Sequence, residues 1–585
     1  MSWIYAVVGL EQGMAIPGGF ERTHANPLFV VKLPSLYVAA GGIPETCQYE
    51  MDEVNPESGW VVVGLGIDVT EGRAKFMDGN DWRGVMLKGG PWSDSLNGHF
   101  AAIRWRGKRF ELFTDELGQR ELYFGKRDNH IVVSTRLDWV SQATGHAEID
   151  FFSFGSKWLT FNQLGYGSSI VGVERLGPRG HLLVENGHSH KREATPWLPE
   201  FANGGIDQAV DTLMSLLRGA MNLKQEVSLG LSGGIDSRLL LACLLSIDRH
   251  RFMVHTFGKP LDPDVAISSR IAEKCHLNRE YFDETLPDAN ATMTMLKEYA
   301  TQACVVEPAS SFLKLRYYPA IRQRGKVLID GGFGEIARRQ YLNRVVRFGR
   351  NALRARDSSA LLPLLRVDRG DIFSQETTSA MLNGAREGLG MMLKGLPNID
   401  EAGVENLVDL LAVRTRIPNY GAPEQSRLDG EVLNFMPLVQ PAFLRAVFRA
   451  NVRGRSNARF YRDLIYRHTP ELAAIPLAKA GSAYPFGLPI PLALILTRIR
   501  ARLGRRFENP DPDILLSHIK EFVLDTAHSM SAVGSPEYDA RKVRNAVDSY
   551  YFKGNARQKS TIDWWLSFEL WRSSLRSHGK EVSRD

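Results

Sequence analysis

Residues 227–246 read VSLGLSGGIDSRLLLACLLS, and this stretch decides the fold. VSLG predicts a buried strand and IDSRLLLACLLS a helix, with Ser232, Gly233 and Gly234 in the turn between them. Glycines let such a turn aim backbone N–H groups at a ligand, and the start of the helix carries partial positive charge, so the turn favours an anion. Asp236 is suited to hold Mg²⁺ between phosphates. The spacing differs from the GxxxxGK[ST] phosphate loop.

The surrounding sequence predicts alternating strands and helices. An amphipathic helix is expected over 207–221, before the glycine turn, and a second strand and helix over 251–258 and 262–277, after it. This alternation is typical of a parallel sheet with crossover helices. From about residue 290 helical patterns dominate, broken by one short strand at 326–330.

The first two hundred residues have a different pattern, which is typical of antiparallel strands. Apolar and aromatic runs such as WIYAVVGL, FAAIRW and FELFTD recur between turns rich in Gly, Asn and Asp. Their alternation is loose, which indicates strands buried on both faces. The predicted fold class is α/β: an N-terminal antiparallel β-sandwich, then a parallel-sheet domain with a helical C-terminal part.

Composition excludes several classes of protein. The chain has 585 residues, 44% hydrophobic and 24% charged, which are ordinary globular values that exclude disordered and fibrous proteins. Its four cysteines form neither a disulfide framework nor a CxxC zinc motif, which favours a cytoplasmic protein. A net charge of +6 is no nucleic-acid signature. The longest apolar run, Leu488 to Leu496, is far shorter than the roughly 20 residues that span a bilayer.

The glycine turn resembles the pyrophosphate loop, SGGxDS, of the ATP-pyrophosphatase superfamily. Members of that superfamily split ATP into AMP and pyrophosphate and activate a carboxylate as an acyl-adenylate. The resemblance implies a HUP-like domain that uses ATP and Mg²⁺. It also implies nucleotide contacts along this turn, by Leu231, Ser232, Gly233, Gly234, Asp236 and Ser237.

A second glycine segment, Leu328 to Glu335, again follows a short strand. It resembles the second nucleotide loop, SGxGxDE, of the asparagine synthetase branch. The resemblance implies that Asp330 and Gly331 contact the nucleotide and that Glu335 holds Mg²⁺ together with Asp236. The Glu that the synthetases carry between the first two glycines is Gly332 here, so their usual acid/base group is missing.

Two further residues are candidates for catalysis. The synthetases place a late lysine on the adenylate and pyrophosphate, where it stabilises the leaving group, and Lys479 is its counterpart by resemblance. Glu431, in RLDGEVLNFMPLVQP, is the candidate base that deprotonates an attacking amine. The alternatives are a solvated lysine and a helix-face carboxylate.

The N-terminal half resembles class II glutamine amidotransferase domains, which have an Ntn-hydrolase-like fold. LNGHFAAIRW, LFTDELGQRELYFG and VERLGPRGHLLV match three landmarks of that class in order. Those enzymes expose a catalytic cysteine directly after the initiator Met, whereas this chain has Ser2, and its nearest cysteine is Cys47. The resemblance implies a degenerate amidotransferase-like domain over 1–195, a linker over 196–207 and a synthetase-like ATP-binding domain over 208–585.

A synthetase domain without a glutaminase must obtain its amine elsewhere. DGGFGEIARRQY and YGAPEQSRLDGEVLNFMPLVQP are most similar to the lasso-peptide cyclase branch. That branch joins the N-terminal amine of a leader-cleaved precursor peptide to an Asp or Glu side chain of the same peptide. The expected partners are this peptide and the pathway's leader peptidase and leader-recognition protein. The alternatives are an asparagine synthetase-like or β-lactam synthetase-like enzyme that acts on a small molecule, and an inactive peptide-binding homologue.

Overall fold

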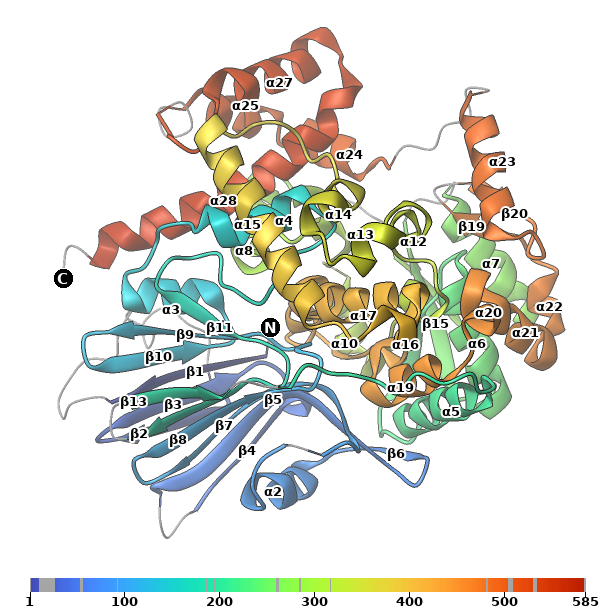
Figure 1. Ribbon diagram of the computed structural model, residues 1–585, viewed down its shortest axis with the longest axis horizontal. Coiled ribbons are helices and arrows are strands. Elements are labelled where there is room, and N and C mark those ends of the chain that lie inside the picture. Colours follow the sequence, from blue (N-terminus) through green and yellow to red (C-terminus); the bar gives the residue numbers. More distant parts are fainter. Residues whose placement is uncertain are drawn as a thin grey trace.

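The computed structural model (Figure 1) describes most of the chain. The described residues are 2–9, 27–52, 56–91, 93–185, 188–192, 195–258, 262–282, 286–315, 317–479, 482–502, 509–529 and 534–582.

Two facing antiparallel sheets form the N-terminal part, at the lower left of Figure 1. Their strand orders among the described residues are β11-β9-β10-β1-β3-β2 and β13-β12-β8-β7-β5-β4, with β6 on β5. The first sheet contains β1 (Trp3–Val8), β2 (Phe29–Leu33), β3 (Leu36–Gly41), β9 (Leu122–Arg127), β10 (His130–Ser134) and β11 (Val173–Leu176). The second contains β4 (Cys47–Met51), β5 (Ser58–Thr70), β6 (Arg73–Phe76), β7 (Leu96–Arg106), β8 (Arg109–Thr114), β12 (His181–Glu185) and β13 (His188–Arg192).

Strand β1 is buried on both faces, which explains its loose alternation. Ile4, Ala6 and Val8 belong to the core between the two sheets. The opposite face of β1 packs toward α3 (Leu137–Thr144), where the rings of Trp3 and Trp139 lie 5.1 Å apart, edge to face. Helices α2 (Gly79–Leu87) and α4 (Phe151–Leu159) complete this part. The predicted sandwich is confirmed.

A five-stranded parallel sheet follows, in the order β16-β15-β14-β17-β18. The chain steps outward from β14 to β15 and β16 and then continues on the other side of β14, so the order reverses between β14 and β17. Ligands of open α/β sheets bind at the carboxyl ends of strands beside such a switch point. The sheet contains β14 (Glu226–Gly230), β15 (Phe252–Phe257), β16 (Arg279–Phe282), β17 (Lys326–Ile329) and β18 (Leu433–Phe435).

Helices surround this sheet and extend from it to the C-terminal part, at the top of Figure 1. The predicted helices over 207–221 and 262–277 are confirmed as α5 and α7. Strands β16 and β18 lie in segments for which the sequence analysis predicts no strand. The helices of this part include α5 (Asp207–Met221), α6 (Ile235–Ile247), α7 (Pro263–Cys275), α8 (Ala289–Ala303), α11 (Gly334–Ala337), α13 (Arg350–Arg354), α15 (Gln375–Lys394), α16 (Ile399–Ala402), α17 (Val404–Arg416), α18 (Ala422–Leu428) and α28 (Lys559–Val582).

The antiparallel and parallel parts are joined by close packing as well as by the chain itself. The amide N–H of Ala74 on β6 donates to Ser215 Oγ on α5 at 2.8 Å. Gly219 allows this approach, because a Cβ atom there would lie 2.8 Å from the Ala74 carbonyl oxygen. The part of the chain that the structure describes has no helix long and apolar enough to cross a membrane.

Candidate functional site

The glycine turn lies at the switch point, between the carboxyl end of β14 and the start of α6. Ser232 and Ser237 close the turn, with their hydroxyl oxygens 3.0 Å apart, and the Gly234 N–H donates to Ser232 Oγ at 3.1 Å. The Gly233 N–H donates to a carboxylate, Asp264 Oδ1, at 2.7 Å. The turn therefore already directs a backbone donor at an anionic oxygen.

The second glycine segment lies beside the first, at the carboxyl end of β17. A Cβ atom at Gly334 would lie 2.5 Å from Asp236 Oδ1, and one at Gly331 would lie 3.1 Å from the Ser237 amide nitrogen. These glycines are required because the two segments touch. The structure thus brings Asp236, Asp330 and Glu335 to one edge of the sheet.

Lys479 lies near the same edge of the sheet, although it is distant from the glycine segments in sequence. It ends β19 (Leu477–Lys479), a strand held on the glycine turn by a hydrogen bond from the Ala478 N–H to the Gly233 carbonyl at 2.8 Å. Burial and the charge of Arg338 lower the pKa of Lys479, whereas Asp236 and Glu335 raise it. Lys479 therefore lies within the electric field of both carboxylates.

Two arginines neutralise the carboxylates of the site. Arg338 donates to both oxygens of Asp236, at 2.7 and 3.0 Å, and Arg416 donates to Glu335 at 3.0 Å. Arg416 is held among aromatic rings, 4.6 Å above that of Tyr420. Burial raises the pKa of Asp236 despite the opposing charge of Arg338. The adjacent Arg339 is different, because it pairs with buried Asp409 at 3.2 Å and so serves the fold.

The carboxylates fit a magnesium–nucleotide site. Nucleotide enzymes commonly hold Mg²⁺ with one or two carboxylates plus phosphate oxygens, and Asp236 and Glu335 provide such a pair. The described residues contain no cluster of three or more His, Cys, Asp or Glu side chains arranged to hold a metal ion alone. The ion would therefore need the phosphates to complete its coordination.

Glu431 does not join this group. It lies two residues before β18, which runs parallel to β17 with Leu433 opposite Val327. Glu431 is therefore at the amino edge of the sheet, whereas Asp330 is at the carboxyl edge. At about 3.3 Å per residue, roughly five residues of strand separate the two positions. The role of Glu431 as the base stays a prediction, and this geometry does not favour it.

The structure also shows features that the sequence analysis missed. Phe257, at the carboxyl end of β15, stacks on Tyr317 with centroids 5.0 Å apart and lies edge to face with Tyr318 at 5.6 Å. A second feature is a pair of carboxylates, Glu307 and Glu424. Burial raises the pKa of Glu424, and the negative charges of Glu307 and Asp330 raise it further. The residues of these two features form no recognisable sequence motif. They lie beside the glycine segments only because the parallel sheet brings them there.

Ser2, at the position where the resemblance expects a nucleophile, is covered by the C-terminal part of the chain. Ser2 is fully buried and its hydroxyl donates to the Asp429 carbonyl at 2.8 Å. The Asp429 carboxylate pairs with Arg120 and lies 2.9 Å from His99 Nε2. Glutamine hydrolysis needs an exposed, activated nucleophile. Burial of Ser2 is therefore consistent with a degenerate domain, which stays a prediction.

Replacing Ser2 by alanine is expected to leave catalytic turnover within about twofold of wild type. The change removes one hydroxyl from a packed interface, and the net stability of one buried hydrogen bond is about 1 kcal/mol. Product formation and glutaminase activity measured on both proteins provide the check. Measurable glutamine hydrolysis by the wild type that disappears in Ser2→Ala would contradict the degenerate-domain interpretation.

Replacing Asp429 by alanine is expected to have a much larger effect on stability. Arg120 and Asp429 are both fully buried, and removal of one partner leaves the other charge uncompensated, at about 3–5 kcal/mol. Thermal unfolding should show the loss, with Ser2→Ala as the matched control at the same interface. An unchanged unfolding midpoint in Asp429→Ala would show that this network does not hold the two halves together.

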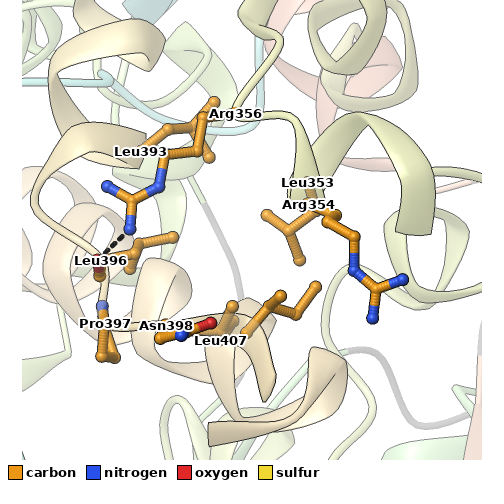
Figure 2. A pocket seen from close by; sticks show the side chains of 9 residues that line it. Leu353, Arg354, Arg356, Leu393, Leu396, Pro397, Asn398 and Leu407 are labelled. Carbon is orange, nitrogen blue, oxygen red and sulfur yellow. Dashed lines mark hydrogen bonds between the residues drawn. The ribbon is translucent and has the colours of Figure 1, made fainter. Parts of the chain in front are cut away.

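A separate hollow of about 220 Å³ lies among α13, α15, α16 and α17 (Figure 2). Leucines line much of it, and Arg356 on its rim donates to the Leu396 carbonyl at 2.8 Å. It contains no carboxylate, thiol or imidazole side chain. We regard it as a gap between packed helices and not as the reaction centre.

Comparison with known proteins gives a distant structural similarity. No family model matches the chain, and no curated protein matches it. The glutamine phosphoribosylpyrophosphate amidotransferase from B. subtilis, complexed with ADP and GMP, matches at 11% identity and a TM-score of 0.22, over 60% of this chain and 79% of that chain. An allosteric regulatory enzyme of purine biosynthesis matches at 12% identity and a TM-score of 0.20, over 60% and 72%. Similarity this distant identifies neither a substrate nor a reaction.

Proposed function

We propose that this protein is an ATP-dependent carbon–nitrogen ligase that activates a carboxylate as an acyl-adenylate and joins it to an amine. One observation carries the proposal. Two glycine segments, two carboxylates and a lysine converge at the switch point of a parallel sheet, although they come from residues 232–237, 330–335 and 479. Adenylation requires these groups: hydrogen-bond donors for pyrophosphate, ligands for Mg²⁺ and a cation near the leaving group.

Each group has a distinct role in the first half-reaction. The glycine turn binds the pyrophosphate end of ATP, and its Gly233 N–H exchanges Asp264 for a phosphate oxygen. Asp236 and Glu335 would hold Mg²⁺, which supplies charge stabilisation at the phosphates. Lys479 stabilises the negative charge that develops as pyrophosphate leaves. Arg338, which pairs with Asp236, would be available to an anion if Asp236 held Mg²⁺.

The substrate we propose is a peptide that the enzyme closes into a macrolactam. Adenylation of an Asp or Glu side chain is followed by attack of the peptide's own N-terminal amine, with release of AMP. The buried Ser2 supports an amine source other than glutamine. A side chain at position 332 would crowd Met436, because a Cβ atom there would lie 3.3 Å from Met436 Sδ. A leader-cleaved precursor peptide is the proposed partner.

The test is ATP–pyrophosphate exchange with a panel of synthetic peptides. Each peptide begins with Gly and carries Asp or Glu seven to nine positions later, and its matched control has Asn or Gln at that position. We expect exchange, and a product one water lighter, only with the acidic peptides. Exchange with aspartate and ammonia would instead favour a small-molecule synthetase. Peptide binding without exchange would indicate an inactive homologue.

A further inference from the structure

Glu424 lies at the carboxyl edge of the parallel sheet, where the proposed reaction takes place. Helix α18 and strand β18 are joined by a short turn, and Gln425 Nε2 in the first half of the helix donates to Asn434 Oδ1 on the strand at 2.7 Å. The helix thus runs back along the strand, and Glu424 in its first turn lies toward the carboxyl end. At that end, the Asp330 N–H donates to the Phe435 carbonyl at 3.1 Å.

Glu424 and Glu307 form a pair of carboxylates with unequal surroundings. Glu307 accepts hydrogen bonds from Tyr299, Tyr420 and Arg427, at 3.2, 3.1 and 2.6 Å. Glu424 accepts none from any residue that the structure describes, and it retains some solvent exposure. One carboxylate is therefore bound and fixed, whereas the other is free to meet a ligand.

Arg427 provides a second sign that a ligand belongs here. Its side chain is 96% buried against Glu307, yet neither Nε nor Nη1 has a hydrogen-bond partner among the described residues. Buried guanidinium nitrogens are costly to leave unpaired. The segment before α18, Ile417–Gly421, forms a π-helix, a geometry frequent at functional sites. The Glu424 carboxylate and two guanidinium nitrogens without a hydrogen-bond partner thus lie close together, next to the Asp330 loop.

We infer that Glu424 is the proton acceptor for the amine that attacks the acyl-adenylate, and that Arg427 binds the carbonyl oxygen next to that amine. The inference rests on the proposed function and names the amine as an α-amine with a carbonyl beside it, as at a peptide N-terminus. The amine nitrogen bonds to the acyl carbon, and the bond from that carbon to the AMP oxygen breaks, its electron pair leaving with AMP. The nitrogen's proton passes to the Glu424 carboxylate and then to solvent.

The pKa of Glu424 supports its role as the proton acceptor for the attacking amine. Burial raises the pKa of Glu424 to about 8, and the charges of Glu307 and Asp330 act in the same direction, whereas Arg427 and Lys314 lower it. An α-amine has a pKa of about 7.7–8.0 and a lysine side chain about 10.4. A base is most effective when its pKa lies near the operating pH. A raised pKa therefore suits Glu424 to accept a proton from an amine near neutral pH.

The central experiment compares Glu424→Gln with wild type on the acidic peptide panel. We expect pyrophosphate exchange to stay within about twofold, because adenylation precedes the step that Glu424 serves. Ring closure should fall by about 10²–10⁴, the usual effect of a general base. Hydroxylamine, which needs no help to lose its proton near neutral pH, should still trap the adenylate as a hydroxamate at the wild-type rate.

A pH profile separates catalysis from a merely structural role. Ring closure by the wild type should rise as pH increases toward about 8, as Glu424 loses its proton, and Glu424→Asp should keep such a rise with a lower plateau. In Glu424→Gln the contribution of Glu424 to this rise should be absent, and only the contribution from deprotonation of the α-amine should remain. Lys314, Asp330, Glu307, Arg427 and the tyrosines Tyr299, Tyr318 and Tyr420 surround the group and remain present in both variants.

Glu431→Gln is the comparison variant, since it makes the same change at the alternative candidate base, which lies at the other edge of the sheet. Normal ring closure in Glu431→Gln with loss in Glu424→Gln is the expected result. Normal closure in Glu424→Gln, or loss of exchange and closure together in both Glu424 variants, would overturn the assignment. No exchange by the wild type with any peptide would instead refute the proposed function, so the two failures are distinguishable.

Discussion

Asp236→Asn is expected to reduce ATP–pyrophosphate exchange by at least about 10³-fold, corresponding to about 4 kcal/mol of transition-state stabilisation. Asp236 is the first-loop carboxylate that would hold Mg²⁺, and Glu335 alone leaves a single protein ligand. The amide keeps the volume of the carboxylate and one acceptor for Arg338. Exchange and nucleotide binding measured over a range of Mg²⁺ concentrations provide the readout.

The fold should survive this change. Burial disfavours the charged form of Asp236, whose pKa is raised, but the change leaves Arg338 without its charged partner. We therefore expect a small fall in the thermal unfolding midpoint, because the amide still accepts a hydrogen bond from Arg338. Asp264→Asn, on the opposite side of the glycine turn, is the matched comparison because it removes a charge without removing a metal ligand. Normal pyrophosphate exchange by Asp236→Asn would refute the Mg²⁺ assignment.

Lys479→Ala should slow formation of the adenylate itself. The lysine is a cation of the site, held near Asp236 by β19, and its charge opposes the negative charge that develops on departing pyrophosphate. Loss of one such group from a preorganised site costs about 10²–10³ in rate, or about 3–4 kcal/mol. Single-turnover formation of AMP is the measurement.

Lys479→Arg distinguishes charge from position. A guanidinium keeps the positive charge but is larger and planar, so we expect partial activity between that of Lys479→Ala and wild type. Nucleotide binding should change less than adenylation in both variants, because the glycine turn remains. Equal losses of binding and of single-turnover rate would show that Lys479 holds ground-state ATP and has no special role in the transition state.

The local part of the fold could be predicted because it depends on short-range patterns. The glycine turn, the strand before it and the helix after it follow from residues 227–246 alone, and 207–221 shows its helical period directly. Strands β16 and β18 were not predicted. β18 is only three residues long, and it is a strand because it pairs with β17, a contact about a hundred residues away in sequence.

Some residues of the candidate site could likewise be placed from local sequence, whereas others depend on long-range contacts. Asp236, Asp330 and Glu335 could be placed because each follows a strand, and the carboxyl ends of parallel strands share one edge. Glu431 could not be placed from the sequence, because its edge depends on the direction of β18. Sequence distance gave no reason to prefer Glu424 over Glu431, although the two lie near opposite ends of α18. Lys479 could be chosen only by resemblance, since its contact with Gly233 is long-range.

The central claim is that a carboxylate is activated by bonding to the α-phosphate of ATP. The most direct test uses an acidic peptide whose Asp or Glu side chain is labelled with ¹⁸O in both oxygens. Mass spectrometry of the nucleotide products after ring closure then locates the label. We predict one ¹⁸O atom in AMP and none in pyrophosphate. Label in inorganic phosphate, formed together with ADP, would contradict adenylation and show that the carboxylate is activated as an acyl phosphate.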